Sequence, residues 1–249
     1  MIWTAPVSLL LASTLFDQSV VQILQRNFPE AQFILVETTR GQVIGSRWTD
    51  STVPVPVGSL VKPFTAIAAG PSRRSFQCDP GKCWLQGGHG RLTLVQAIAH
   101  SCNSYFLQLA RGISEDQVRT VAQRYGLPLP ASMAPEALTG FGSDWRISPV
   151  VLAKAYGEIA LAQEAATVRE GMRESANHGT GKAIGLAALA KTGTAPCSHL
   201  QKAPGDGYVV VLYPAQSPKY ILLVQVHGVS GAVAATTAGR MTTVLRDGK

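Results

Sequence analysis

The chain has 249 residues, 46% of them hydrophobic and 24 of them glycine, which is typical of a folded globular protein with a sizeable core. Its formal net charge of +7 favours anionic partners, and both nucleic acid and an acidic cell-envelope polymer qualify. No run of lysine and arginine is interleaved with aromatic residues, so the sequence argues against nucleic-acid binding.

The first 16 residues, MIWTAPVSLLLASTLF, are apolar from Val7 to Phe16 but lack the basic residues that open a secretory signal. They are interpreted either as a weak or trimmed signal or as part of a helix. Residues 17–249 are predicted to form a single domain, since no internal repeat or low-complexity tract divides them. No later segment reaches the roughly 18 uninterrupted apolar residues of a membrane span, so we expect this domain to lie outside the membrane.

One helix and one hairpin are predicted at the start of this domain. In SVVQILQRNF, residues 19–28, the apolar positions fall on one helix face, which predicts a helix. The following QFILVETTRGQVIGSRW contains two β-rich runs joined at Arg40 and Gly41, which predicts a hairpin from Phe33 to Trp48.

Helical periodicity dominates from Leu92 to Leu161, and strands return near the end of the chain. GYVVVLYPAQSPKYILLVQVHG predicts a second hairpin, and GAVAATTAGRMTTVL predicts a final helix. We therefore predict an α+β fold, in which an antiparallel sheet of about five strands from both chain ends carries helices on its faces. A helical lobe, at about residues 71–185, is inserted in the middle.

Ser59 and Lys62 stand three residues apart in VGSLVKPFTAIAAG, where an apolar helix begins. That spacing puts both on one helix face, so the lysine amine can reach the serine hydroxyl. Free amides at a helix N-terminus favour a developing anion, and burial near a second cation would let the lysine act as a base. The alternative is ordinary helix-start chemistry, because serine is a preferred N-cap.

Two further motifs lie at predicted element boundaries. Ser101 and Asn103 interrupt an apolar helix face in AIAHSCNSYFLQLA, where we expect the helix to break. The sequence 175–177, Ser-Ala-Asn, has the same form, so this pattern is not unique. Lys191, followed by Thr-Gly-Thr, stands where the strand signal resumes, and this combination can bind a carboxylate and admit a substrate backbone.

Cys78 and Cys83, with His89 nearby, suggest a metal site, but the usual second ligand pair with tight spacing is absent. The sequence therefore predicts no metal. A disulfide between Cys78 and Cys83 is expected if the chain is exported, and two reduced thiols are expected if it is not. A phosphate-loop interpretation of GTGKA fails because Ala183 stands where serine or threonine is needed, so residues 179–182 are predicted to be a loop near the Lys191 strand.

Together, these motifs resemble the penicillin-binding protein transpeptidases, which share their fold with the serine β-lactamases. The stretches GSLVKPFTA, GHGRLTLVQAIAHSCNSYFLQLA, GFGSDWRISPVVLAKAYGEIA and LAKTGTA resemble that family in family order. With the early hairpin, the resemblance covers nearly everything after Asp17. It implies an extracytoplasmic location, in the periplasm or at the outer face of the cytoplasmic membrane.

The resemblance implies a role for each motif. Ser59 would be the acylated nucleophile and Lys62 its general base. Ser101 would relay a proton toward the leaving amine, and Asn103 would hold the peptide amide of the substrate.

The same resemblance makes the segment from Lys191 onward the carboxylate site. Lys191 would complete the electrostatics, while Thr192, Gly193 and Thr194 would bind the terminal carboxylate of the substrate and let its backbone approach. The backbone amides of Ser59 and Thr194 would form the oxyanion hole.

The implied substrate is a peptidoglycan stem peptide ending in D-Ala-D-Ala, with β-lactams as inhibitors and cell-wall assembly proteins as partners. The acyl group would pass from Ser59 to an amine (transpeptidase) or to water (carboxypeptidase), and neither a metal nor an organic cofactor is implied. A glycosyltransferase domain or long N-terminal pedestal is not expected in so short a chain, and the short interval from Ser59 to Ser101 suggests a trimmed helical lobe.

Two other functions stay open. A β-lactamase would share the acylation step, but class D enzymes carry valine at the position of Asn103, and no glutamate is placed as in class A. The Lys-Pro-Phe that begins at Lys62 also looks more like a penicillin-binding protein than a class D enzyme. The second alternative is a penicillin-sensing or scaffold domain that acylates slowly or only binds.

Overall fold

The computed structural model describes residues 7–71 and 74–248, with side chains from Leu15 onward. Residues 1–6 of the predicted leader lie outside this range, while Val7–Phe16 form the first turns of helix α1 (Val7–Asn27). The helix is longer than predicted, because neither glycine nor proline interrupts the apolar run that precedes residue 19. Among the described helices, none is both long and apolar enough to cross a membrane.

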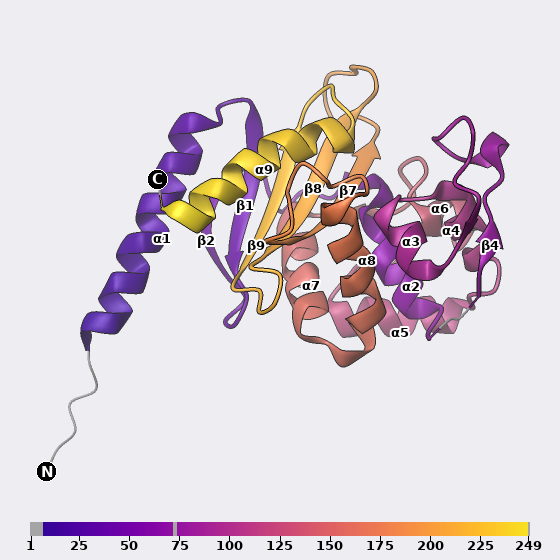
Figure 1. Cartoon of the computed structure of the whole chain (residues 1–249), viewed down its shortest axis with the longest axis horizontal. Coiled ribbons are helices and arrows are strands. Elements are labelled where there is room, and N and C mark those ends of the chain that lie inside the picture. Colours follow the sequence, from indigo (N-terminus) through magenta and orange to yellow (C-terminus); the bar gives the residue numbers. More distant parts are fainter. Residues whose placement is uncertain (1–6, 72–73, 249) are drawn as a thin grey trace, which may run out of the picture.

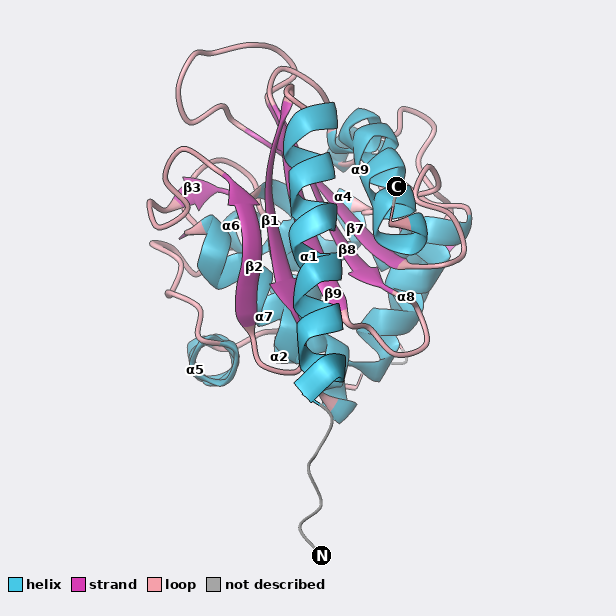
Figure 2. Ribbon diagram, turned by 90° about the vertical axis from the view of Figure 1, so that its left-hand side faces the viewer, coloured by secondary structure: helices cyan, strands magenta, loops and turns pink. Residues whose placement is uncertain are grey.

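A five-stranded antiparallel sheet forms the centre of the molecule, in the order β2-β1-β9-β8-β7 (Figures 1 and 2). Its strands are β1 (Ala31–Glu37), β2 (Gln42–Arg47), β7 (Leu189–Ala195), β8 (Asp206–Tyr213) and β9 (Tyr220–Val226). The first and last parts of the chain meet where β1 pairs with β9, Ile34 lying opposite Leu223. Both predicted hairpins are confirmed, and so is the α+β fold with a sheet from both chain ends.

Alternation along the strands divides the core into two layers. Phe33 and Leu35 pack with α1 and α9 (Gly231–Asp247) on one face, and Ile34 and Val36 face the helices inserted in the middle of the chain. Figure 1 shows α9 lying across the sheet beside α1, while α7 and α8 occupy the opposite side. The same alternation directs the side chain of Lys191 on β7 toward the inserted helices.

The inserted part is helical, with short two-residue strand pairs that the periodicity does not predict. Its elements are η1 (Gly58–Val61), α2 (Lys62–Ala68), η2 (Pro80–Lys82), α3 (Leu94–Ala99), α4 (Asn103–Ala110), α5 (Glu115–Tyr125), α6 (Pro135–Thr139), α7 (Pro149–Leu161), η3 (Gln163–Ala165), α8 (Ala166–Asn177) and the pairs β3 (Val55–Pro56) with β6 (Arg146–Ile147) and β4 (Phe76–Gln77) with β5 (Arg91–Leu92). Local signals define the helix ends. A capping box of Ser114 and Gln117 opens α5, and Gly126 closes it with φ 65°.

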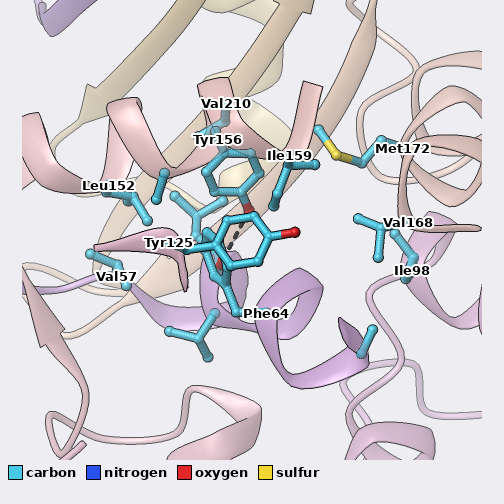
Figure 3. Close-up of a cluster of buried hydrophobic side chains, with 14 of the residues drawn as sticks. Val57, Phe64, Ile98, Tyr125, Leu152, Tyr156, Ile159, Val168, Met172 and Val210 are labelled. Carbon is cyan, nitrogen blue, oxygen red and sulfur yellow. Dashed lines mark hydrogen bonds between the residues drawn. The ribbon is translucent and has the colours of Figure 1, made fainter. Parts of the chain in front are cut away.

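Aromatic packing fixes the helix that begins at Lys62. Phe64 on α2 is fully buried, with the rings of Tyr125 and Tyr156 edge-on to it at 5.6 and 5.4 Å (Figure 3). The Tyr156 hydroxyl donates a hydrogen bond of 2.8 Å to the carbonyl of Leu60. Helix α7, which packs on the sheet, therefore holds η1 in place beside β7.

Candidate active site

Ser59 lies on the short 3-10 helix η1, at the wall of a cavity between the sheet and the helical part of the chain. The residue that caps η1 is Val57, and no side chain hydrogen-bonds the cap, so Ser59 does not serve as an N-cap. The backbone around it is closely packed. A Cβ atom on Gly58 would lie 2.2 Å from the carbonyl oxygen of Thr194, so η1 and β7 approach as near as glycine allows.

Lys62 is the first residue of α2 and is fully buried beneath the cavity. Its Nζ donates to the carbonyl of Ser101 at 2.9 Å and to Oδ1 of Asn103 at 2.5 Å, and it lies 3.5 Å from Oγ of Ser101. Burial lowers the pKa of Lys62 to about 7, although the nearby thiols of Cys102 and Cys83 raise it. A lysine in this state can exchange protons near neutral pH.

Ser101 occupies the turn between α3 and α4, where the helix was predicted to break. Its φ of 51° is unique among the described non-glycine residues, and such strain accumulates at functional sites. Lys191 donates from Nζ to Oγ of Ser101 at 2.8 Å and to the carbonyl of Thr192 at 2.6 Å. Burial lowers the pKa of Lys191 well below its ordinary value, and neighbouring Lys62 lowers it further. The hydroxyl of Ser101 is thus shared between two buried amines.

Strand β7 brings hydroxyl groups to the same cavity. Thr192 donates from Oγ1 to Oγ1 of Thr180 at 2.6 Å, and Oγ1 of Thr194 accepts from the amide of Gly231 at 2.9 Å. Gly193 between them allows close contact with η1, because a Cβ atom there would lie 2.9 Å from the carbonyl oxygen of Val57.

These segments enclose a cavity of about 290 Å³. Six of the eight predicted site residues line it, namely Ser59, Ser101, Asn103, Thr192, Gly193 and Thr194. The remaining two, Lys62 and Lys191, lie behind this wall and contact Ser101. The structure therefore brings three motifs together through contacts of Ser101 that span 39 and 90 positions of the chain.

The second Ser-Ala-Asn triplet lies elsewhere. It falls inside the last turn of α8, and the buried hydroxyl of Ser175 has no hydrogen-bond partner among the described residues. None of its three residues lines the cavity. The tertiary structure thus separates two triplets that local sequence cannot distinguish.

Sequence analysis missed several residues of the cavity wall. Thr180 is one, although its segment was predicted to be a loop near the Lys191 strand, which the Thr192 contact confirms. Trp84, Phe141 and Ser230 also line the cavity, and each lies in a loop or just before a helix. Hydrophobic periodicity cannot identify binding residues in loops. The only indication in the sequence was the tryptophan at position 84 itself, which the structure shows to be exposed.

Residues 46–242 match the family model described as the penicillin-binding protein transpeptidase domain. That match covers most of the chain, so the protein belongs to this family, whose members are acyltransferases. The predicted family and fold are confirmed. No curated protein sequence matches the chain.

Solved structures show the same fold at low identity. The D,D-transpeptidase domain of a peptidoglycan glycosyltransferase from Eggerthella lenta aligns with a TM-score of 0.75 at 15% identity, over 91% of this chain and 80% of that chain. Penicillin-binding protein A from Mycobacterium tuberculosis, solved as an imipenem acyl-enzyme complex, aligns at 0.73 and 17% identity over 93% and 78%. Penicillin-binding protein 2 from Helicobacter pylori, in complex with MreC, aligns at 0.77 and 15% identity over 93% of this chain but only 62% of its own.

Proposed function

We propose that the protein is a serine acyltransferase that acts on peptidoglycan stem peptides ending in D-Ala-D-Ala and is acylated by penicillins at Ser59. The observation that carries this proposal is the shared position of the Ser101 hydroxyl, which contacts the amines of Lys62 and Lys191 at the wall of the cavity that Ser59 lines. Acyl transfer from a serine requires a base for the serine hydroxyl and a proton donor for the leaving amine, and these groups can supply both.

Acylation in this cavity begins with a neutral Lys62. Its amine takes the proton of the Ser59 hydroxyl as Oγ forms a bond to the penultimate carbonyl carbon, and the carbonyl oxygen becomes an oxyanion. The backbone amides of Ser59 and Thr194 are the proposed donors to that oxyanion. When the peptide bond breaks, the proton on Lys62 passes through Ser101 to the leaving nitrogen, and D-alanine departs.

Substrate recognition is assigned to the remaining polar groups. The hydroxyl of Thr194 accepts from the amide of Gly231 and keeps its own proton for the terminal carboxylate. The hydroxyl of Thr192 would turn from Thr180 toward the same carboxylate, beside the amine of Lys191. The amide of Asn103, which already accepts from Lys62 through Oδ1, has its NH₂ group left to face the substrate peptide.

The acyl-enzyme is expected to persist with penicillins. The described residues that line the cavity include no carboxylate that could activate water as the glutamate of class A enzymes does, which favours a transpeptidase over a β-lactamase of that class. The imipenem acyl-enzyme of the Mycobacterium tuberculosis relative supports covalent reaction with β-lactams. The complex of the Helicobacter pylori relative with MreC supports a partner protein for this chain. An extracytoplasmic location is proposed from the family to which the chain belongs.

A labelled penicillin tests this function. The protein should gain one label per chain by mass, on the peptide that contains Ser59, and Ser59→Ala should gain none while keeping the same circular dichroism. Folded wild-type protein that acquires no label would contradict the proposal. Rapid loss of the label with continued penicillin turnover would instead identify a β-lactamase.

A further inference from the structure

Three cysteines and one histidine converge behind the turn that carries Ser101 and Asn103. Cys78, Cys83, His89 and Cys102 each place one donor atom within 4.8 Å of the others. All four cysteines of the chain are free thiols in the structure. The proposed acylation uses none of these groups, so the cluster needs a separate explanation.

The distances in the cluster match the spacing of ligands around a tetrahedral zinc ion. With bonds of about 2.3 Å to sulfur and about 2.0 Å to nitrogen, such an ion separates two sulfurs by about 3.8 Å and sulfur from nitrogen by about 3.5 Å. The Sγ atom of Cys102 lies 3.4 Å from that of Cys78 and 3.8 Å from that of Cys83. Nδ1 of His89 lies 3.7 Å from Sγ of Cys78 and 3.4 Å from Sγ of Cys83.

The surroundings also suit ligands held for a metal. Cys78 and Cys102 are buried, and the backbone amide of Tyr105 donates to Sγ of Cys102 at 3.5 Å. The ring of His89 packs between Trp84 at 5.1 Å and His100 at 5.3 Å, which fixes its orientation. Three thiols cannot all pair as disulfides, whereas three sulfurs and one imidazole nitrogen complete a tetrahedral zinc shell.

We propose that Cys78, Cys83, Cys102 and His89 bind one zinc ion, which fixes the turn of Ser101 and Asn103 to the segment from residue 78 to residue 89. Binding would release the protons of the three thiols to solvent and leave the imidazole neutral, with Nδ1 on the metal. The site is of the closed, structural kind, because the protein supplies all four ligands.

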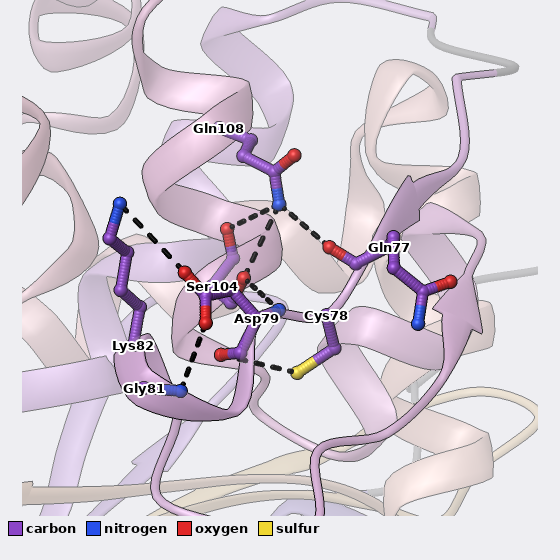
Figure 4. A network of polar contacts seen from close by, with 7 residues as sticks. All are labelled: Gln77, Cys78, Asp79, Gly81, Lys82, Ser104 and Gln108. Carbon is purple, nitrogen blue, oxygen red and sulfur yellow. Dashed lines mark hydrogen bonds and ion pairs between the residues drawn. The ribbon is translucent and has the colours of Figure 1, made fainter.

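The ligands come from segments that the fold already holds together. The amide of Asp79 donates to Oγ of Ser104 at 2.8 Å, and Nε2 of Gln108 donates to the carbonyl of Gln77 at 3.0 Å, so the first cysteine is attached to α4 (Figure 4). The rest of that segment contains only the three-residue helix η2 as regular structure. A metal would add a further constraint to this irregular segment, whose two ends already meet where the amide of Cys78 donates to the carbonyl of Gly90.

A bound metal would hold in place two parts of the cavity wall, the turn of Ser101 and Asn103 and the side chain of Trp84. Cys102 is the middle residue of the turn whose neighbours contact Lys62. Trp84, next to Cys83, lines the cavity and donates from Nε1 to the carbonyl of His100 at 3.0 Å. The expected effect on acylation rests on the proposed function, but metal binding itself does not.

A second cluster of donors provides the matched control. Cys197, Asp206 and His227 also lie within 4.8 Å of one another. Both carboxylate oxygens of Asp206 are already hydrogen-bonded, one to Gln225 at 2.7 Å and the other to His227 at 2.8 Å. The carboxylate of Asp206 is therefore already hydrogen-bonded at both oxygens within the protein. Cys197→Ser removes a thiol without touching the proposed site.

Metal content tests the proposal independently of any activity. The full chain, purified with zinc present and then desalted, should retain one zinc ion per chain by elemental mass spectrometry. After exchange with Co²⁺, it should show the thiolate charge-transfer and strong visible bands of a tetrahedral site. Cys197→Ser should keep both properties, and Cys83→Ser should lose the metal. Metal-free wild type, or loss of metal in Cys197→Ser with retention in Cys83→Ser, would overturn the proposal.

Thiol accessibility covers the case in which Cys83→Ser does not fold. In the zinc-loaded wild type, a thiol reagent should leave Cys83 unmodified, although Cys83 is the partly exposed thiol of the cluster. After a chelator is added, Cys83 should react. Chelation should also lower the rate of penicillin acylation about tenfold or more, and added zinc should restore it. Equal reactivity of Cys83 with and without the chelator in the zinc-treated protein, or a disulfide among Cys78, Cys83 and Cys102, would contradict a metal site.

Discussion

Lys62 illustrates how burial changes the chemistry of a single side chain. Full burial lowers the pKa of its amine to about 7, and the carbonyl of Ser101 and the amide oxygen of Asn103 accept its protons. In water the same amine would be almost entirely protonated at neutral pH and could not act as a base.

The pH dependence of acylation should follow this titration. Because only the neutral amine accepts the proton of Ser59, the acylation rate constant should be nearly constant above pH 7 and should fall about tenfold per pH unit below it. Rates with a labelled penicillin between about pH 5 and about pH 9 would measure this, with penicillin stability checked at each pH. Lys62→Ala should lose most of the activity and this acid limb, and a wild-type rate independent of pH would contradict the assignment.

At the scale of elements, the contact of β7 with η1 positions Ser59, the proposed nucleophile. Gly193 lies against the carbonyl of Val57 and the amide of Leu60, and Gly58 lies against the carbonyl of Thr194. The two backbones therefore approach at both ends of the contact, which brings Ser59 and Thr194 to the wall of the same cavity.

Gly193→Ala should disturb this contact. The added Cβ would lie 2.9 Å from the carbonyl oxygen of Val57 and 3.1 Å from Cγ of Leu60, so η1 must move away from β7. A displacement of about 1 Å can lower a rate about 100-fold, and we expect a loss of that order in acylation, with unfolding free energy reduced by about 1 to 3 kcal/mol.

Gly157→Ala is the control for that substitution. A Cβ on Gly157 in α7 meets only Ile221, at 3.9 Å, so acylation should be unchanged and the helix up to about 1 kcal/mol more stable. Chemical denaturation and acylation rates of both variants would measure the effects. A Gly193→Ala protein with wild-type acylation would show that the contact does not position Ser59.

At the scale of the whole molecule, one hydrogen bond connects helix α7, which packs on the sheet, to η1, the short helix that carries Ser59. Tyr156 belongs to α7, which packs on the sheet, and its hydroxyl reaches the buried carbonyl of Leu60 next to Ser59. The helices and the sheet face share one hydrophobic core, which includes Ile34 of β1 and Phe64 of α2.

Tyr156→Phe should weaken that connection. The substitution leaves the Leu60 carbonyl buried without its partner, so we expect the unfolding free energy to fall by about 1 to 3 kcal/mol and acylation to slow. Tyr208→Phe is the matched control, because the Tyr208 hydroxyl is buried and has no hydrogen-bond partner among the described residues. Its removal should cost no stability, and equal losses in both variants would argue against a specific role of the Leu60 contact.

Much of the architecture could be predicted because its signals are local. The hairpin from Phe33 to Trp48 and the helix that ends the chain follow from periodicity over a few residues, since side-chain spacing alone determines which face is buried. The two-residue pairs β3 with β6 and β4 with β5 escaped prediction, because so short a strand shows no period and exists only through its partner.

By itself, the sequence determined the order of helices and strands and the three motifs at their boundaries, because both depend on neighbouring residues. Only the tertiary structure decided that Lys62 and Lys191 share the hydroxyl of Ser101, since contacts across 39 and 90 positions depend on packing. The same is true of Cys102. In the sequence, Cys78 and Cys83 with His89 form an incomplete metal motif. The fold places the thiol of Cys102 beside them, which completes the proposed four-ligand site.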